Sequence, residues 1–165
     1  MNTLLLNALI LHILLGIAGI VVFAGIALLL RGEKLSVNWL KFCSYLGLFT
    51  FVGSWIAGGY YYTSYYGKAV KPVIIGGSDA WVHTVLMETK EHVFLFLPFL
   101  AFVFFVLINF FSSELRINKK LKKNLILLCF VIVSLGLAIT ISGMAISGSV
   151  VKKPAAYLPN ITQNT

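Results

Sequence analysis

Long apolar runs separated by short polar stretches make up most of this chain. Four runs stand out, at roughly 4–30, 41–62, 92–111 and 124–148. Each is long enough to cross the hydrocarbon core of a bilayer as a helix, which takes about 20 residues. A membrane β-strand would instead alternate apolar and polar residues over about ten positions. The pattern therefore predicts an all-α membrane protein, a four-transmembrane-helix up-down-up-down bundle that forms a single domain over 1–165.

The polar stretches set the expected boundaries of these helices. Residues 63–79 are rich in tyrosine and glycine and are expected to form an outer loop. A helix is expected to restart near Ser78 or Asp79, either of which is a good N-cap, so that the third helix covers 80–111. Residues 149–165 are expected to form a C-terminal tail. The first run has no basic residue before it and no cleavage motif after it, so we expect it to stay as a helix rather than act as a signal peptide.

The basic residues indicate an orientation. The chain has a net charge of +8, a mean hydropathy of +0.96 and only 11% charged residues. Eight basic residues fall in the first and third connections: Arg31, Lys34, Lys41, Arg116, Lys119, Lys120, Lys122 and Lys123. Because cytoplasmic loops carry the excess of Lys and Arg, the pattern predicts a multi-pass protein of the cell (inner) membrane with both termini outside. No basic stretch is interleaved with stacking aromatics, so nucleic acid is not an expected partner.

The cysteines carry little functional information. Cys43 and Cys129 fall in the cytoplasmic halves of the second and fourth predicted helices, where a disulfide is unfavourable. We expect them to fill helix contacts as small apolar residues. The sequence holds no CxxCH motif, which excludes covalently attached c-type haem.

A layer of polar side chains is expected near the outer edge of the membrane. Counting about 20 residues from the basic end of each helix brings His12, Tyr61 and His92 to one depth. Glu88 and His92 lie four residues apart, so they share a helix face, with Glu91 beside them. The other face of the same segment carries His83 and Lys90, and we expect His83 to lie in the headgroup zone.

Two histidines on different helices are compatible with one b-type haem. His12 and His92 are the candidate axial ligands, Gly16 leaves room beside the ring, and Glu88 is placed to orient the imidazole of His92. The helix count and this histidine pair resemble the architecture of small four-helix membrane cytochromes b, including quinone-linked ones. That resemblance implies electron transfer. Because such cytochromes often hold two haems on four histidines, the three histidines here limit the number to one haem.

A quinone is a second expected ligand of the same layer. Glu88 and Glu91 are candidate catalytic proton acceptors, and Tyr61 and Trp55 are candidates for hydrogen bonding and stacking.

Three other interpretations stay open. Copper would use His12 and His92 with Met144 or Met87, since copper accepts imidazole and thioether ligands. The second interpretation is a non-catalytic subunit or assembly factor of a larger membrane complex. The glycines aligned along the helix faces and the exposed aromatics fit that role equally well. A proton-coupled carrier ranks last, because inverted repeats and broken helix pairs are missing. A di-iron site is excluded, since it needs about four Glu ligands from the bundle.

Overall fold

The long helices of the bundle agree with the four apolar runs. The computed structural model describes residues 2–32, 36–77 and 80–151. Its four longest α-helices are α1 (Thr3–Arg31), α2 (Val37–Tyr61), α4 (Glu88–Phe111) and α5 (Lys119–Val151). With their helical extensions, all four are long and apolar enough to cross a membrane. The prediction of an all-α, four-helix bundle of the membrane-spanning type is confirmed.

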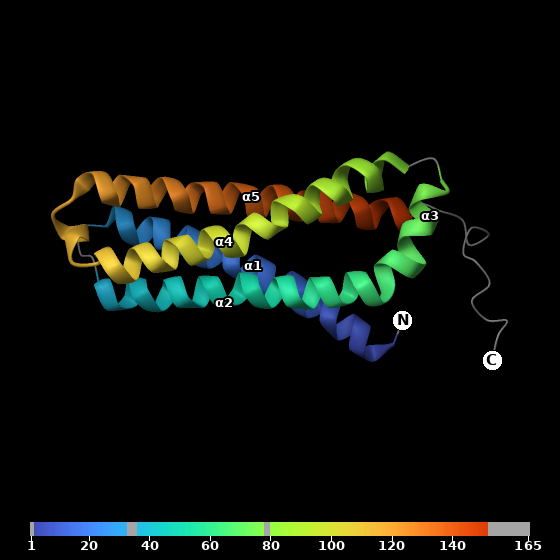
Figure 1. The fold of residues 1–165 in the computed structure, drawn as a ribbon, viewed down its shortest axis with the longest axis horizontal. Helices are drawn as coiled ribbons and strands as arrows, with labels where there is room; N and C mark the ends of the chain where they lie inside the picture. The colour runs from blue at the N-terminus through green and yellow to red at the C-terminus, as the bar shows by residue number, and fades with distance from the viewer. Residues whose placement is uncertain (1, 33–35, 78–79, 152–165) are drawn as a thin grey trace.

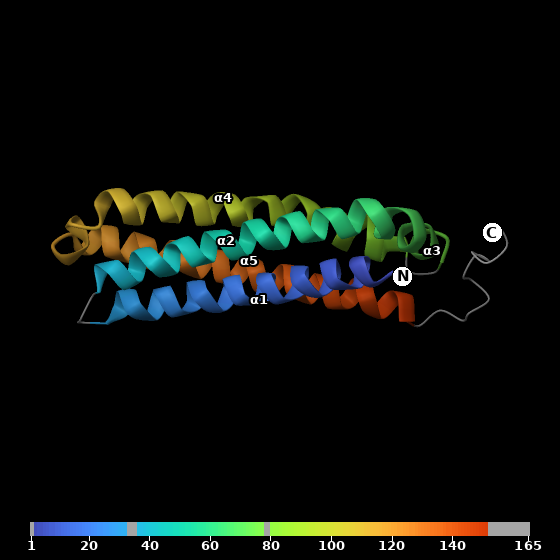
Figure 2. The same ribbon diagram turned by 90° about the horizontal axis from the view of Figure 1, so that it is seen from below.

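The four helices surround one central axis. α1 packs against α2 and α5, and α4 packs against the same two helices, so α1 and α4 lie diagonally opposite. Figures 1 and 2 show that each long helix runs opposite to the one before it in the chain. The short 3-10 helix η3 (Glu114–Arg116), the last turn of α1 and the first turn of α2 share one end, which we call the basic end. The other end, which carries α3, is called the α3 end.

The prediction of an outer loop over 63–79 is wrong for residues 63–75, which are helical. α2 continues through the π-helix η1 (Tyr62–Val70) into the short helix α3 (Lys71–Ile75), which ends at a turn containing Gly76. Pro72 is compatible with this helix because it stands in the first turn, where its missing N–H is not needed. A second π-helix, η2 (Val82–Met87), leads into α4. The two candidate N-caps, Ser78 and Asp79, lie outside the described residues.

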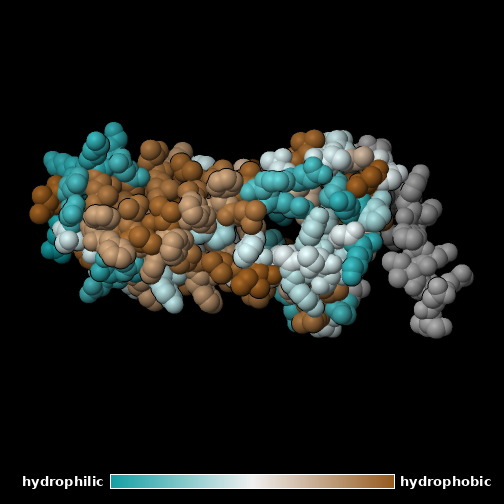
Figure 3. Space-filling view, viewed as in Figure 1, coloured by the Kyte–Doolittle hydropathy of each residue, from teal (hydrophilic) through white to brown (hydrophobic). Residues whose placement is uncertain are grey.

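The half of the bundle next to the basic end is tightly packed. The ring of Phe23 stacks on Phe51 at a centroid distance of 5.7 Å and meets the edge of Phe104 at 5.4 Å. A Cβ atom on Gly47 would lie 2.6 Å from the Phe23 ring, so this glycine is what allows the ring to fit. Small residues let membrane helices approach closely in this way. Figure 3 shows apolar side chains covering most of this half, hydrophilic ones at its tip and at the α3 end, and a hollow between the apolar region and the α3 end.

Candidate functional site

A cavity occupies the half of the bundle toward the α3 end, and it has two adjoining lobes. The apolar lobe has a volume of about 340 Å³ and is lined mainly by α1, α4 and α5, with Phe51 and Ser54 of α2. The aromatic lobe has a volume of about 520 Å³ and is lined mainly by α2, η1, α4 and α5, with Leu9 and His12 of α1. Both are lined by Leu9, His12, Lys90, Phe94, Gly143 and Ser147. These shared residues form the junction of the lobes.

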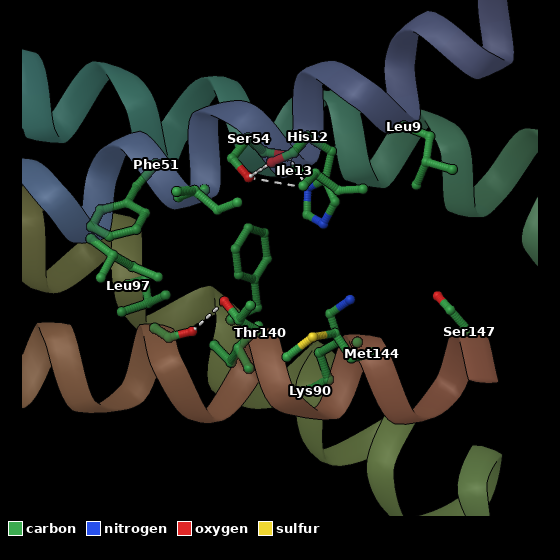
Figure 4. Close-up of a pocket in the computed structure, with 17 residues that line it drawn as sticks. Leu9, His12, Ile13, Phe51, Ser54, Lys90, Leu97, Thr140, Met144 and Ser147 are labelled. Carbon is green, nitrogen blue, oxygen red and sulfur yellow. Dashed lines mark hydrogen bonds between the residues drawn. The ribbon is translucent and has the colours of Figure 1, made fainter. Parts of the chain in front are cut away.

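His12 on α1 is fixed in one tautomer by its hydrogen bonds. Its Nδ1 lies 2.8 Å from the backbone carbonyl oxygen of Ser54, and the Ser54 hydroxyl donates to the carbonyl oxygen of His12 at 2.8 Å. A carbonyl oxygen accepts only, so Nδ1 carries the hydrogen and Nε2 of the neutral ring is an acceptor. A Cβ atom on Gly58 would lie 2.5 Å from Nδ1, so Gly58 makes room for the ring. Figure 4 shows Nε2 pointing into the cavity.

Lys90 on α4 faces His12 across the cavity. Figure 4 shows its amine and the His12 ring directed toward one another. Its Nζ lies against α5, 3.3 Å from where a Cβ atom of Gly143 would stand. Within the described part of the chain, Nζ has no hydrogen-bond partner, and its electrostatic neighbours are Glu91 and His12. The prediction that Lys90 lies on the face opposite to the site is wrong, since Lys90 lines both lobes. An ionisable side chain inside a membrane bundle is expected to be functional.

The wall of the aromatic lobe combines tyrosines with one buried acid. The rings of Tyr62 and Tyr66 stack at a centroid distance of 5.3 Å. Glu91 lies close enough for its side chain to interact with Tyr62, while its Oε1 atom is buried without a hydrogen-bond partner among the described residues. The lobe therefore offers an acid, phenol hydroxyls and flat aromatic surfaces to a single ligand.

His83 is buried behind this wall. Only 1% of its surface is exposed, so the side chain is enclosed by protein. Its Nδ1 shares a hydrogen bond of 3.2 Å with the Tyr66 hydroxyl, and its Nε2 is buried with no partner in the described segments. The π-helical turn of η2 holds His83 here, packed under η1 and α3. The helix period groups His83 with Lys90, and the structure has both residues on the inner side of the bundle; the prediction was wrong in directing the opposite face, with Glu88 and His92, inward.

The structure brings together part of the predicted site. His12, Trp55, Tyr61 and Glu91 line the aromatic lobe. Gly16 lines the apolar lobe. Tyr62 agrees with the prediction that tyrosines at the end of the second helix contribute to the site. Tyr66 and His83 were not predicted, and Lys90 was considered only for the proton-coupled carrier.

His92 and Glu88 do not join the other predicted residues. Both are exposed, and neither lines either lobe. The Nδ1 of His92 instead donates to the backbone carbonyl oxygen of Glu88, 2.7 Å away and one turn earlier in α4. The expectation that His12 and His92 face one another is therefore not met: His12 points into the bundle, while His92 points away from it.

Metal ligands are sparse at this site. The part of the chain that the structure describes holds no group of three or more His, Cys, Asp or Glu side chains arranged to hold a metal ion. Cys43 and Cys129 are free thiols, and Cys129 is buried in the core beside Ile132. Comparison of this chain with protein-family models, with curated proteins and with solved structures finds no match.

Proposed function

We propose that the cavity binds the head group of a quinone-type lipid, which makes the protein a redox component of the membrane. The observation that carries this proposal is the opposition of His12 and Lys90 across the cavity. The Lys90 ammonium is a donor that needs an acceptor, and a quinone carbonyl oxygen supplies one. The Nε2 atom of His12 is an acceptor that needs a donor, and a quinol hydroxyl supplies one.

The walls of the aromatic lobe suit a flat ring. Trp55, Tyr61 and Tyr62 supply aromatic surface for stacking. The lobe volume of about 520 Å³ falls within the range of about 300–1,000 Å³ that is usual for small-molecule sites. Oxidation of a quinol to a quinone releases two protons and two electrons. His12 and Glu91 are placed to take the protons, and the electrons pass to a partner membrane subunit that the proposal requires.

Haem b and copper stay predictions. His12 offers one ligand atom, Nε2, oriented by a carbonyl as ligating histidines usually are. The second imidazole does not fit, because His92 lies outside the cavity. An absorption spectrum of the dithionite-reduced protein with metal analysis tests both cofactors: an α-band with stoichiometric iron supports haem, and a colourless, metal-free protein rejects haem and copper.

The charge distribution also supports an orientation. We infer that the basic end, with Arg116 and the lysines of the α5 start, faces the cytoplasm and that both termini lie outside. The quinone site then lies in the outer leaflet of the cell membrane. Reaction of a membrane-impermeant reagent with a cysteine introduced at Asn2 of intact cells, but not with one introduced at Lys119, tests this orientation.

Quenching of tryptophan fluorescence measures the proposed binding. Trp55 lines the cavity, while Trp39 and Trp81 do not. A soluble quinone added to the protein in lipid nanodiscs is therefore expected to quench the wild type and the Trp39→Phe variant but not Trp55→Phe. Lys90→Met is expected to weaken binding about tenfold, since it removes a charge-assisted hydrogen bond.

The matched control is Lys68→Met, because Lys68 is exposed on η1 and lies outside both lobes. Equal quenching in all tryptophan variants, or equal affinity in both lysine variants, contradicts the proposal.

A further inference from the structure

We propose that the ligand is a lipid with a single long apolar chain, whose ring occupies the aromatic lobe and whose chain leaves through the apolar lobe into the bilayer between α1 and α5. This inference rests on the proposed quinone site and deepens it. It assigns the ligand class, a quinone with a prenyl-type chain, and it assigns the route by which the ligand enters the protein.

The two lobes differ in the chemistry that they offer. The acid and the tyrosines all belong to the aromatic lobe. Apart from Ser147 at the junction, the hydroxyls of the apolar lobe are already used within the protein: Thr140 donates to the carbonyl oxygen of Gly136 at 2.9 Å, and Ser54 donates to that of His12. Beyond the junction, a ligand therefore meets no unsatisfied hydrogen-bonding side chain among the described residues, and a hydrocarbon chain fits that environment.

The apolar lobe is closed toward the basic end and reaches the surface at its side. Its floor is formed where Ile20 packs on Gly136, since a Cβ atom on that glycine would lie 2.6 Å from the isoleucine. Ile13 and Ile17 on α1 and Met144 on α5 line the lobe, and their side chains are also exposed on the outside of the bundle. The lobe therefore opens sideways between α1 and α5, on a surface that faces lipid.

The order of the lobes matches the orientation of a quinone in a bilayer. The aromatic lobe lies nearer the α3 end, where η1 and its tyrosines stand, and the apolar lobe lies nearer the middle of the helices. A quinone bound in this way would keep its ring near the α3 end and its chain toward the middle of the helices. A water-soluble ligand has no apolar chain that could occupy a lobe opening on lipid.

Two probes with one ring separate the contributions of ring and chain. The probes are a benzoquinone without a chain and the same benzoquinone with a chain of two isoprene units, and binding is measured by Trp55 quenching in nanodiscs. Thr140→Phe and Met144→Phe place a ring in the apolar lobe or at its mouth. The control is Ile141→Phe, since Ile141 is as exposed as Met144, at 63%, but does not line the lobe.

The chained probe is expected to bind at least about tenfold more weakly to the Thr140 and Met144 variants, because its chain has no exit. The chainless probe is expected to keep its wild-type affinity within about twofold in the same variants. Ile141→Phe is expected to bind both probes as the wild type does. In the wild type, a photoreactive group at the chain end is expected to label Ile17, Ile20 or Met144.

The outcomes distinguish this inference from the proposed function. Binding of the chainless probe, with no selective loss of the chained probe in either variant, overturns the chain route and leaves the quinone site standing. Labelling of residues outside α1 and α5 does the same. Failure of the wild type to bind either probe overturns both proposals.

Discussion

Polar side chains and glycines have different roles in the two halves of the bundle. In the half next to the basic end, buried hydroxyls bond to carbonyl oxygens within their own helix, as Thr50 does to Gly47 at 2.9 Å. In the half toward the α3 end, hydroxyls such as that of Thr140 do the same, but His12 bonds to Ser54 on another helix, and the buried Nε2 atom of His83 has no partner among the described residues. Natural proteins seldom leave buried polar atoms unsatisfied without a reason. The comparison indicates that the first half supplies stability and the second half supplies the site.

Glycines make room for side chains in both halves, but for side chains of different kinds. In the packed half, the space above Gly47 is filled by the apolar Phe23 ring. In the hollow half, Gly58 makes room for the His12 ring and Gly143 for the Lys90 amine, which are polar groups that line the cavity. One residue type thus has two roles, and the difference depends on which side chain the neighbouring helix presents.

The largest effect on stability is expected from a substitution in the packed half. Gly47→Leu is expected to lower the free energy of unfolding by about 2–3 kcal/mol, because the new side chain overlaps the Phe23 ring and disturbs its contacts with Phe51 and Phe104. Thermal unfolding in detergent measures this change, with a thiol-reactive dye that reports exposure of the buried Cys129.

Gly25→Leu is the matched control for this experiment. No atom lies within 4 Å of a Cβ at Gly25, so this variant is expected to change the stability by less than about 1 kcal/mol, in the stabilising direction, since Gly is a poor helix former. Equal losses for both glycines would mean that close packing around Phe23 is not what stabilises this half.

A smaller effect on stability is expected at the hydrogen-bonded pair of Tyr66 and His83 behind the aromatic lobe. Tyr66→Phe removes the hydrogen bond to His83 and leaves both ring nitrogens of that histidine without partners, at an expected cost of about 1 kcal/mol. In a His83→Phe background the same change is expected to cost less, because no imidazole is left unsatisfied. A double-mutant cycle on melting temperature measures the coupling. Strictly additive effects would show that the hydrogen bond does not connect η1 to η2.

The sequence predicted the packed half better than the hollow half, for a physical reason. Apolar runs and glycine spacing follow from helix length and helix period, so the four helices and the contribution of His12, Trp55 and Tyr61 to one site could be inferred. The helix period also groups His83 with Lys90 and Glu88 with His92, as the structure has them. Which of these two faces points inward depends on how the helix is rotated against its neighbours, and the π-helical start η2 changes that rotation. The spacing alone does not fix the rotation, so the prediction directed His92 inward and Lys90 outward.

The smallest effect is expected for His92, one of the two histidines that the sequence predicted as a ligand pair with His12. His92 is exposed, and its only hydrogen bond among the described residues joins it to its own helix, so His92→Ala is expected to change stability by no more than about 0.5 kcal/mol. Quinone affinity in the same variant is expected to equal that of the wild type. His12→Ala removes the acceptor at the junction of the lobes and is expected to weaken quinol binding about tenfold. Parallel titrations of quinol against the two variants measure the difference. Equal losses would show that both imidazoles hold one ligand, and the site would then have to include the outer face of α4.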